Sequence, residues 1–185
     1  SAHWDVDGET QYYAHFPAEP GSEVITAEAP GIKPHDKHAL CLIHRRKAAA
    51  GAAGPLESAF VAVLEPQFGP SRIKGVERLS LTRARAGVTP AAVRVNLAEG
   101  FDLIYTSGDS VVRTVSGGAP TSAVVNGRFL QARFIEDGKG IARLDTLNLV
   151  GGSHFKAAGW EIETEEPGWQ GTVTRVDSPR KQIHT

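Results

Sequence analysis

The chain has 185 residues, of which 41% are hydrophobic and 22% are charged, and this composition is that of an ordinary globular protein. Its 20 Lys and Arg residues against 21 Asp and Glu residues give a net charge of -1, which argues against a general nucleic-acid-binding protein. The single cysteine excludes an internal disulfide, and no apolar run approaches the roughly 20 residues of a membrane span.

The N-terminal part of the sequence predicts four strands. QYYAHF at 11–16 is rich in aromatic residues and ends before a proline, and SEVITAEA at 22–29 follows a Pro-Gly turn. HALCLIH at 38–44 and FVAVLEP at 60–66 are continuous apolar runs, which are typical of strands covered on both faces, although a short buried helix has the same pattern. RRKAAAGAAGPLES at 45–58 is interpreted as a loop or a helical turn.

After residue 73 the hydrophobic pattern alternates with a period of two. Val93, Val95 and Leu97 share one face of a predicted strand. The segment 126–152 contains two strands joined by EDGKG, and Asp-Gly between alternating segments is a strong hairpin signal. Short strands at regular spacing with glycine-rich turns predict an all-β protein, an antiparallel sandwich of two stacked sheets (supersandwich-like) with little or no helix.

We expect residues 1–185 to form a single β-sandwich domain, with a weak seam near 84–90 that divides either two sheets or two sub-domains. The chain begins at SAHWDV without a methionine and stops at QIHT without a polar tail. We therefore expect it to be a piece of a longer protein.

Two histidines are candidate metal ligands. His35 and His38 flank an aspartate in PHDKH, and this set could contribute to a site for a divalent metal such as zinc. The spacing matches none of the specific zinc motifs, so a solvated loop before a strand explains the same residues.

A cluster of cations follows the apolar run at 38–44. His44, Arg45 and Arg46 could line a groove for an acidic polysaccharide, because arginine binds carboxylate or sulfate in bidentate fashion. Alternatively, the cluster is the solvated end of a strand, where charges maintain solubility.

Aromatic residues are candidates for proton transfer or sugar stacking. Tyr12, Tyr13 and Tyr105 deserve consideration in a lyase, because tyrosine serves as a general acid or base when its pKa is lowered. All three equally suit packing within strands. For His15 we expect a half-buried ring with a hydrogen-bond partner rather than a general base. Phosphate-binding glycine loops, HExxH, CxxC and G-x-S-x-G are absent.

The stretch SAFVAVLEPQFGPSRIKGVERL at 58–79 resembles the β-sandwich region of heparinase II/III-like polysaccharide lyases. In that family a strand of the form S-x-F-V-x-V-[IL]-E-P precedes a short turn and a strand rich in Val and Leu. The pattern is filled here by Ser58, Phe60, Val61, Val63, Leu64, Glu65 and Pro66. The stretches that resemble the family's other strands, in the same order, are YYAHFPAEPGSEVITAEAPG, ALCLIHRRKAAAG, GFDLIYTSGD, NGRFLQARFIEDGKGIARLDTLNLVGGSHF and GWQGTVTRVDSPRKQI.

The resemblance implies a bacterial parent enzyme, periplasmic or secreted, that cleaves uronic-acid polysaccharides such as glycosaminoglycans or alginate by β-elimination. It also implies an α-helical toroid ahead of the sandwich, together with an upstream H-D-Y-x-x-H-G-like motif that carries a metal-binding histidine. That motif is absent from this sequence, so no catalytic residue is assigned. We expect the chain to form one wall of the cleft, to contact the acidic polysaccharide, and to show no turnover by itself.

Two other kinds of protein would share this pattern. One is a free-standing carbohydrate-binding module, which would present a row of exposed aromatic side chains. The other is a structural or interaction domain, which would bind no sugar and would expose an apolar patch. The exposure of Trp4, Tyr12 and Tyr13 is the observation that separates these alternatives.

Overall fold

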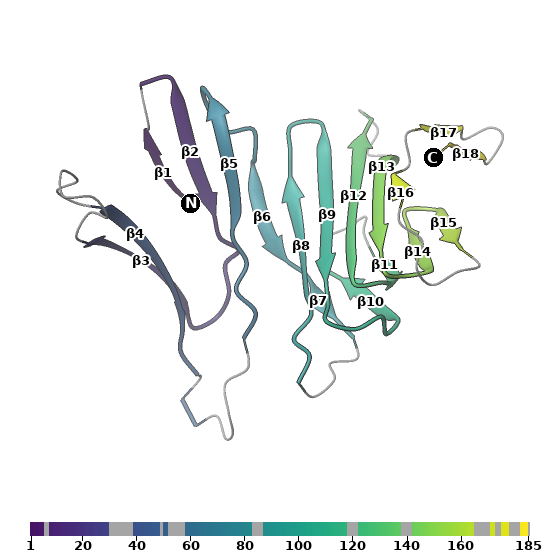
Figure 1. Cartoon of the computed structure of the whole chain (residues 1–185), viewed down its shortest axis with the longest axis horizontal. Helices are drawn as coiled ribbons and strands as arrows, with labels where there is room; N and C mark the ends of the chain where they lie inside the picture. The colour runs from purple at the N-terminus through teal and green to yellow at the C-terminus, as the bar shows by residue number, and fades with distance from the viewer. Residues whose placement is uncertain are drawn as a thin grey trace. The chain divides into compact units, whose positions relative to one another are not determined.

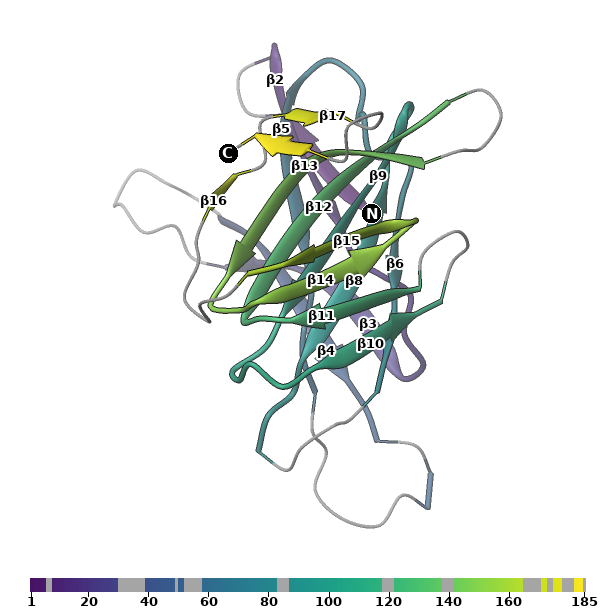
Figure 2. The same cartoon turned by 90° about the vertical axis from the view of Figure 1, so that its right-hand side faces the viewer.

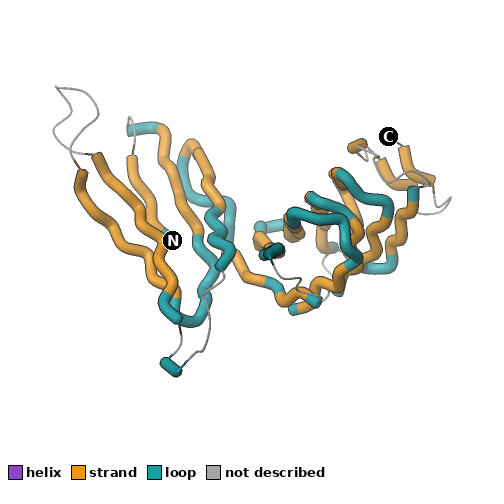
Figure 3. The backbone as a smooth tube through the Cα atoms, turned by 60° about the horizontal axis from the view of Figure 1, so that its bottom comes forward, coloured by secondary structure: helices purple, strands orange, loops and turns teal. Residues whose placement is uncertain are grey.

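The computed structural model describes residues 1–5, 8–29, 39–48, 50–51, 58–82, 87–117, 122–137, 142–164, 171–172, 175–177 and 182–184. These residues form strands that pair antiparallel and contain no helix, as Figure 3 shows. The prediction of an all-β, antiparallel protein is confirmed. The described part of the chain accordingly has no helix long and apolar enough to cross a membrane.

The chain divides into two compact units. One, which we call the sandwich unit, contains Ser1–Pro17 and Val61–Thr185, and the other, the ribbon unit, contains Ala18–Phe60. The division falls elsewhere than the predicted seam near 84–90, where residues 83–86 lie outside the described part. That seam stays a prediction.

The ribbon unit contains a two-stranded sheet of β3 (Ser22–Ala29) and β4 (Ala39–Arg46), which pair along their whole length (Figure 1). At the end of the pair where Ser22 lies opposite Arg46, the Lys47 amide donates a hydrogen bond to the Gly21 carbonyl oxygen over 2.8 Å. Gly21 has φ 74°, and a Cβ there would lie 2.6 Å from the Lys47 carbonyl oxygen, so the turn requires glycine.

The sandwich unit contains two large sheets that pack face to face (Figure 2). The six-stranded sheet has the order β16-β13-β12-β9-β8-β6 and comprises β6 (Gly75–Arg78), β8 (Ala91–Asn96), β9 (Gly100–Thr106), β12 (Phe129–Glu136), β13 (Ala142–Val150) and β16 (Gly171–Thr172). The five-stranded sheet has the order β15-β14-β11-β10-β7 and comprises β7 (Ser80–Leu81), β10 (Arg113–Ser116), β11 (Ala123–Asn126), β14 (His154–Ala157) and β15 (Trp160–Glu163). A separate pair joins β17 (Arg175–Asp177) to β18 (Gln182–His184).

The core lies between these two sheets and is built from alternate residues of their strands. The six-stranded sheet contributes Ala92, Phe101, Leu103, Tyr105, Leu130, Ala132, Phe134, Leu144, Leu147 and Leu149, and the five-stranded sheet contributes Val115, Ala123, Val125, Phe155, Ala157 and Ile162. The predicted period of two and the sandwich it implies are therefore confirmed.

A β-bulge in β13 directs its leucine side chains on both sides of the bulge into this core. Arg133 pairs with Thr146 but Phe134 pairs with Leu144, so Asp145 is the extra residue. Without it, Leu144 and Leu147 would point to opposite faces, because side chains three apart alternate in a regular strand. With it, both leucines are buried in the core.

A buried cation joins the two sheets. Arg113 of β10 is 0% exposed, and its Nη1 donates to the Tyr105 hydroxyl of β9 over 3.0 Å. The guanidinium also holds both carboxylate oxygens of Asp109, at 2.5 and 3.1 Å. Hydrogen bonds from Arg113 lower the pKa of Asp109 far below its ordinary value, against the opposing effect of burial. Tyr105 thus serves packing rather than proton transfer.

A third sheet of the sandwich unit has the order β1-β2-β5, from β1 (Ala2–Asp5), β2 (Thr10–His15) and β5 (Val63–Phe68). Its strand register separates two faces. One face carries the uncharged side chains of Trp4, Tyr12, Leu64, Pro66 and Phe68, and the other carries His3, Gln11, Tyr13, His15, Glu65 and Gln67. One side of this small sheet is thus apolar and the other is polar.

The prediction that the two continuous apolar runs are covered on both faces is wrong for the described residues. In the first run Ile43 of β4 is 47% exposed, and in the second run Phe60 and Leu64 are 55% and 63% exposed. The reason is the layering, because β4 belongs to a two-stranded sheet and β5 is the edge strand of a three-stranded one. An apolar run becomes a buried strand only where a second layer covers it.

Candidate functional site

Glu65 organises the segment that connects β5 to β6. Its Oε1 accepts a hydrogen bond from the Arg72 amide at 2.8 Å, and its Oε2 accepts one from the Ser71 hydroxyl at 2.6 Å. The same Oε2 lies 3.2 Å from Nε2 of His15. Burial raises the pKa of Glu65, but the hydrogen bonds from Ser71, the Arg72 amide and His15 outweigh it, and the net pKa lies below its usual value.

Ser71 and His15 are positioned by this carboxylate rather than by each other. The Ser71 hydroxyl has one proton, which it donates to Glu65, and its oxygen accepts the Ile73 amide at 3.1 Å. His15 Nε2 lies 3.5 Å from the Ser71 oxygen. A serine nucleophile needs a histidine between it and the acid, whereas here the acid lies between them. The arrangement therefore fixes the β5–β6 connection, and His15 has the partner that was expected of it.

Three polar rings lie in a row on the same face of the sheet. His3 of β1 pairs across the strands with Tyr13 of β2, and their ring centroids are 5.6 Å apart at 24°. Tyr13 and His15 are two residues apart on β2, and their centroids are 6.2 Å apart at 21°. The Tyr13 hydroxyl lies 2.5 Å from Oε1 of Gln11 and 3.3 Å from the Gly69 carbonyl oxygen. Tyr13 is thereby held in place by the sheet and by the connection.

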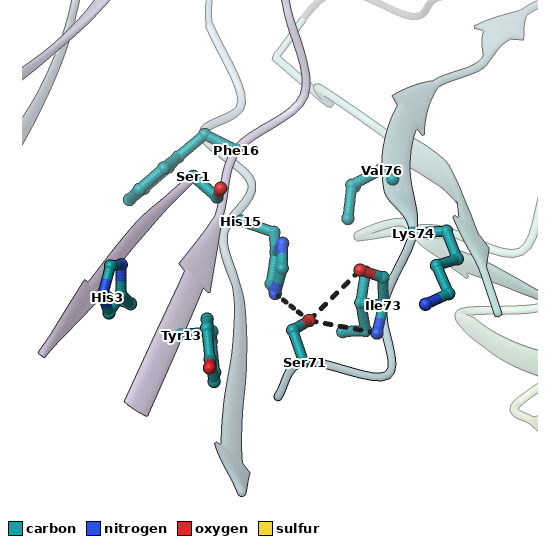
Figure 4. Close-up of a pocket in the computed structure, with 10 residues that line it drawn as sticks. Ser1, His3, Tyr13, His15, Phe16, Ser71, Ile73, Lys74 and Val76 are labelled. Atoms are coloured by element: carbon teal, nitrogen blue, oxygen red, sulfur yellow. Dashed lines mark hydrogen bonds between the residues drawn. The ribbon is translucent and has the colours of Figure 1, made fainter. Parts of the chain in front are cut away.

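The row opens onto a pocket of about 280 Å³, which we call the ring pocket. Figure 4 shows His3, Tyr13 and His15 on one side and Lys74 on the other, with Ser71 and Ile73 between them. The Lys74 amide donates to the Asn96 carbonyl oxygen at 2.7 Å, which anchors the residue where β6 begins. The volume of the ring pocket is at the small end of the range for ligand sites, which suits one sugar ring or a similar polar group.

Lys74 contributes a positive charge to the lining of the ring pocket. The Lys74 side chain is exposed, and in the described part of the chain no carboxylate forms an ion pair with it. Glu65 is the neighbouring acid, and its oxygens already accept the hydrogen bonds described above. An ammonium together with imidazole, phenol and hydroxyl groups can bind a carboxylate and neighbouring hydroxyls.

The three residues predicted to bind substrate lie together on β4 of the ribbon unit, on alternating faces. His44 Nε2 lies 2.6 Å from the Ser22 hydroxyl, and the ring meets Phe60 edge to face at 5.0 Å. Arg46 is on the same face as His44 and lies 3.5 Å from Glu19. The strand brings these two together and directs Arg45 to the opposite face.

Arg45 is already matched by a carboxylate across the ribbon. Its Nε donates to Glu23 at 2.7 Å, and Lys47 lies 3.1 Å from the same oxygen. Hydrogen bonds from Arg45 and then Lys47 lower the pKa of Glu23, and Glu23 in turn raises the pKa of Arg45. An acidic glycan would compete with Glu23 for this arginine. The role predicted for His44, Arg45 and Arg46 stays a prediction.

The predicted metal ligands His35 and His38 lie outside the described residues. Among the residues that are described, no group of three or more His, Cys, Asp and Glu side chains is arranged to hold a metal ion. The metal site therefore stays a prediction as well.

Reasoning from the sequence missed the participation of His3, Ser71 and Lys74. Tyr13 and His15, two residues apart in a predicted strand, already indicated a shared polar face. No local sequence pattern indicated that Ser71 would be hydrogen-bonded to Glu65 on that face, or that β1 would place His3 beside Tyr13.

Comparisons with protein-family models, with curated proteins and with solved structures gave no significant match. The resemblance to heparinase II/III-like lyases therefore rests on the sequence motifs alone.

Proposed function

We propose that this chain is the β-structured portion of a polysaccharide lyase that acts on uronic-acid glycans, where it forms one wall of the cleft and binds the chain without cleaving it. The observation that carries the proposal is the row of His3, Tyr13 and His15 opposite Lys74. The remaining catalytic machinery would belong to an α-helical toroid, as the family resemblance implies.

The ring pocket suits a uronic acid on chemical grounds. A uronate carries one carboxylate and several hydroxyls on a ring with an apolar face. Lys74 would pair with the carboxylate, while the imidazole and phenol groups would bond to hydroxyls and their rings would contact the sugar face. Because Lys74 is exposed, its ion pair would contribute only about 0.2–1 kcal/mol, so the hydrogen bonds and ring contacts must supply the rest.

The same geometry favours binding over turnover. β-Elimination needs a base at C5 of the uronate and a group that neutralises the adjacent carboxylate. In the ring pocket, the Tyr13 hydroxyl donates to the Gln11 side-chain oxygen or to the Gly69 carbonyl oxygen, and His15 contacts the Glu65 carboxylate. These two candidate bases are already engaged, which supports a non-catalytic role.

The test is a calorimetric titration of the whole chain with tetrasaccharides of heparin, alginate and hyaluronan. The ultraviolet absorbance of unsaturated product is measured in parallel. We expect saturable binding of at least one glycan and no product. Lys74→Gln should weaken binding, whereas Lys156→Gln, which removes a lysine of β14 that is paired with Glu161 of β15, should not. Absence of binding to all three glycans would overturn the proposal, and product formation would overturn its non-catalytic part.

A free-standing carbohydrate-binding module is the second candidate, and a specific observation favours it. The uncharged face of the β1-β2-β5 sheet carries Trp4 and Tyr12, whose rings stack 5.9 Å apart at 14°, beside the exposed Phe68. Trp4 and Tyr12 are each half-buried, so this face is an aromatic surface that is only partly open, and Tyr13, also half-buried, lies on the opposite face. A module of this kind would bind neutral cello- or xylotetraose and lose that binding in Trp4→Ala.

A further inference from the structure

A second and larger hollow adjoins the ring pocket. We call it the basic groove; it has a volume of about 750 Å³ and is lined by Phe68 of β5, by Arg72 and Lys74 of the β5–β6 connection, by Leu97 and Glu99 of the β8–β9 turn, and by Arg133 of β12, among others. Ser71 and Lys74 line both the groove and the ring pocket. One ligand could therefore reach both hollows past the same short segment.

The cations of the groove differ in how far they are already neutralised. Arg133 donates from Nε and Nη2 to the two oxygens of Asp102, both at 2.7 Å, which is a closed bidentate pair. Arg72 uses its backbone amide to bind Glu65, and in the described residues its guanidinium forms no ion pair. In the described residues the Lys74 ammonium likewise forms no ion pair. The positive charge open to a ligand thus lies on the connection.

The acids of the groove lie on other elements. Glu99 belongs to the β8–β9 turn, and Asp145 is the bulged residue of β13, 3.9 Å from Nη2 of Arg143. The two cations that are open to a ligand are two residues apart on one segment, whereas these carboxylates come from two different elements, the β8–β9 turn and the interior of β13. An anionic group would therefore bind beside Arg72 and Lys74 and not along the whole groove.

An aromatic side chain is available beside these cations. Phe68 is 77% exposed at the end of β5, three residues before Ser71. A phenyl ring that lines a hollow offers an apolar surface against which one face of a sugar ring can pack. A charged group for an anion and a ring for a sugar face are the two elements of an acidic-sugar subsite.

We propose that the basic groove is a second subsite for the same glycan, in which Arg72 and Lys74 recognise the acidic group of a neighbouring sugar. The inference rests on the proposed function, because the first sugar is held in the ring pocket. Lys74, which borders both hollows, lies between the two acidic groups. The chain therefore selects glycans that carry acids on adjacent sugars, and a single uronate occupies only half of the site.

The experiment measures dissociation constants of the whole chain for galacturonate, digalacturonate and tetragalacturonate, with neutral cellotetraose as the uncharged ligand. The wild type is compared with Arg72→Gln and with Arg128→Gln, which removes an exposed arginine at the turn before β12 as a matched control. We expect the dimer and tetramer to bind at least tenfold more tightly than the monomer. Arg72→Gln should weaken tetramer binding about two- to fivefold, the range of one exposed ion pair, and should leave monomer binding unchanged. Arg128→Gln should leave the binding of every ligand unchanged.

The outcomes separate the two proposals. If neither the galacturonates nor the tetrasaccharides of heparin, alginate and hyaluronan bind, the proposed function fails, and if only those tetrasaccharides bind, the second subsite is refuted. If the monomer binds as tightly as the tetramer, or if Arg72→Gln affects monomer and tetramer equally or not at all, the ring pocket stands and the second subsite is refuted. Equal binding of cellotetraose refutes recognition of the acid. Chemical-shift changes at Phe68 and Leu97 on addition of tetragalacturonate to the wild type give a second readout that needs no variant, and their absence also refutes the subsite.

Discussion

Strands β4 and β12 contain similar amounts of apolar sequence but end in opposite environments. On β12 of the sandwich unit, Leu130, Ala132 and Phe134 are all essentially inaccessible, whereas on β4 of the ribbon unit Ile43 is 47% exposed. The difference is the second sheet, since β12 faces the five-stranded sheet and the ribbon consists of two strands. Apolar content alone therefore does not predict burial, which depends on whether a second layer covers the strand.

The largest expected effect comes from truncating the sandwich core. Phe134→Ala removes a ring that is stacked 4.9 Å from Phe101 and that is almost wholly buried. We expect a loss of about 3–5 kcal/mol in the free energy of unfolding, measured by urea denaturation. Ile43→Ala in the ribbon should change the same quantity by less than about 1 kcal/mol, because half of the side chain is already in water. Equal losses would contradict the contrast between the two units.

The next effect concerns the cation that joins the two sheets. Arg113→Met keeps the apolar stem but removes the hydrogen bonds to Asp109 and Tyr105. We expect a loss of about 2 kcal/mol, the range of a charged hydrogen bond, because Asp109 keeps access to water. Arg128→Met at the exposed turn is the control and should leave the urea midpoint unchanged. If Arg113→Met left the free energy of unfolding unchanged, the sheets would be held together by apolar contacts alone.

A smaller and pH-dependent effect is expected at Glu65. Glu65→Gln should cost about 1 kcal/mol at pH 7 through weakened bonds to Ser71 and the Arg72 amide. Because the folded-state pKa of Glu65 is lowered, its stabilisation is complete above the unfolded pKa of about 4.3 and is lost as the pH falls through the folded value. The difference between wild type and variant should thus shrink from pH 6 to pH 3 in urea melts. A difference that is constant with pH would mean that the carboxylate charge does not hold the connection.

The smallest effect is expected where the sequence predicted the glycan site. The double variant Arg45→Gln and Arg46→Gln tests the ribbon directly. Both arginines already lie beside carboxylates, Glu23 and Glu19, so we expect the tetragalacturonate affinity to change by less than about twofold. A loss larger than that of Lys74→Gln would assign the glycan to the ribbon and away from the ring pocket.

Local sequence patterns predicted most of the secondary structure because they depend on neighbours along the chain. The alternation after residue 73 predicted strands in that part of the chain, and Asp137 with Gly138 predicted the hairpin between β12 and β13, whose pairing is observed although residues 138–141 lie outside the described part. The bulge at Asp145 was not predicted, because it depends on the register against β12. The same holds for the two-unit division, which separates residues 17 and 18 and residues 60 and 61.

The amino-acid sequence by itself determined that this protein is made of strands and, outside the bulge in β13, which residues of a strand share a face, since both follow from a period of two. The tertiary structure decided which faces are covered and which polar side chains meet. His15 and Glu65 are 50 positions apart and meet only because β2 pairs with β5 in one register. A shift of that register by one residue would reverse the faces and separate the ring row from Lys74, and no local pattern encodes that choice.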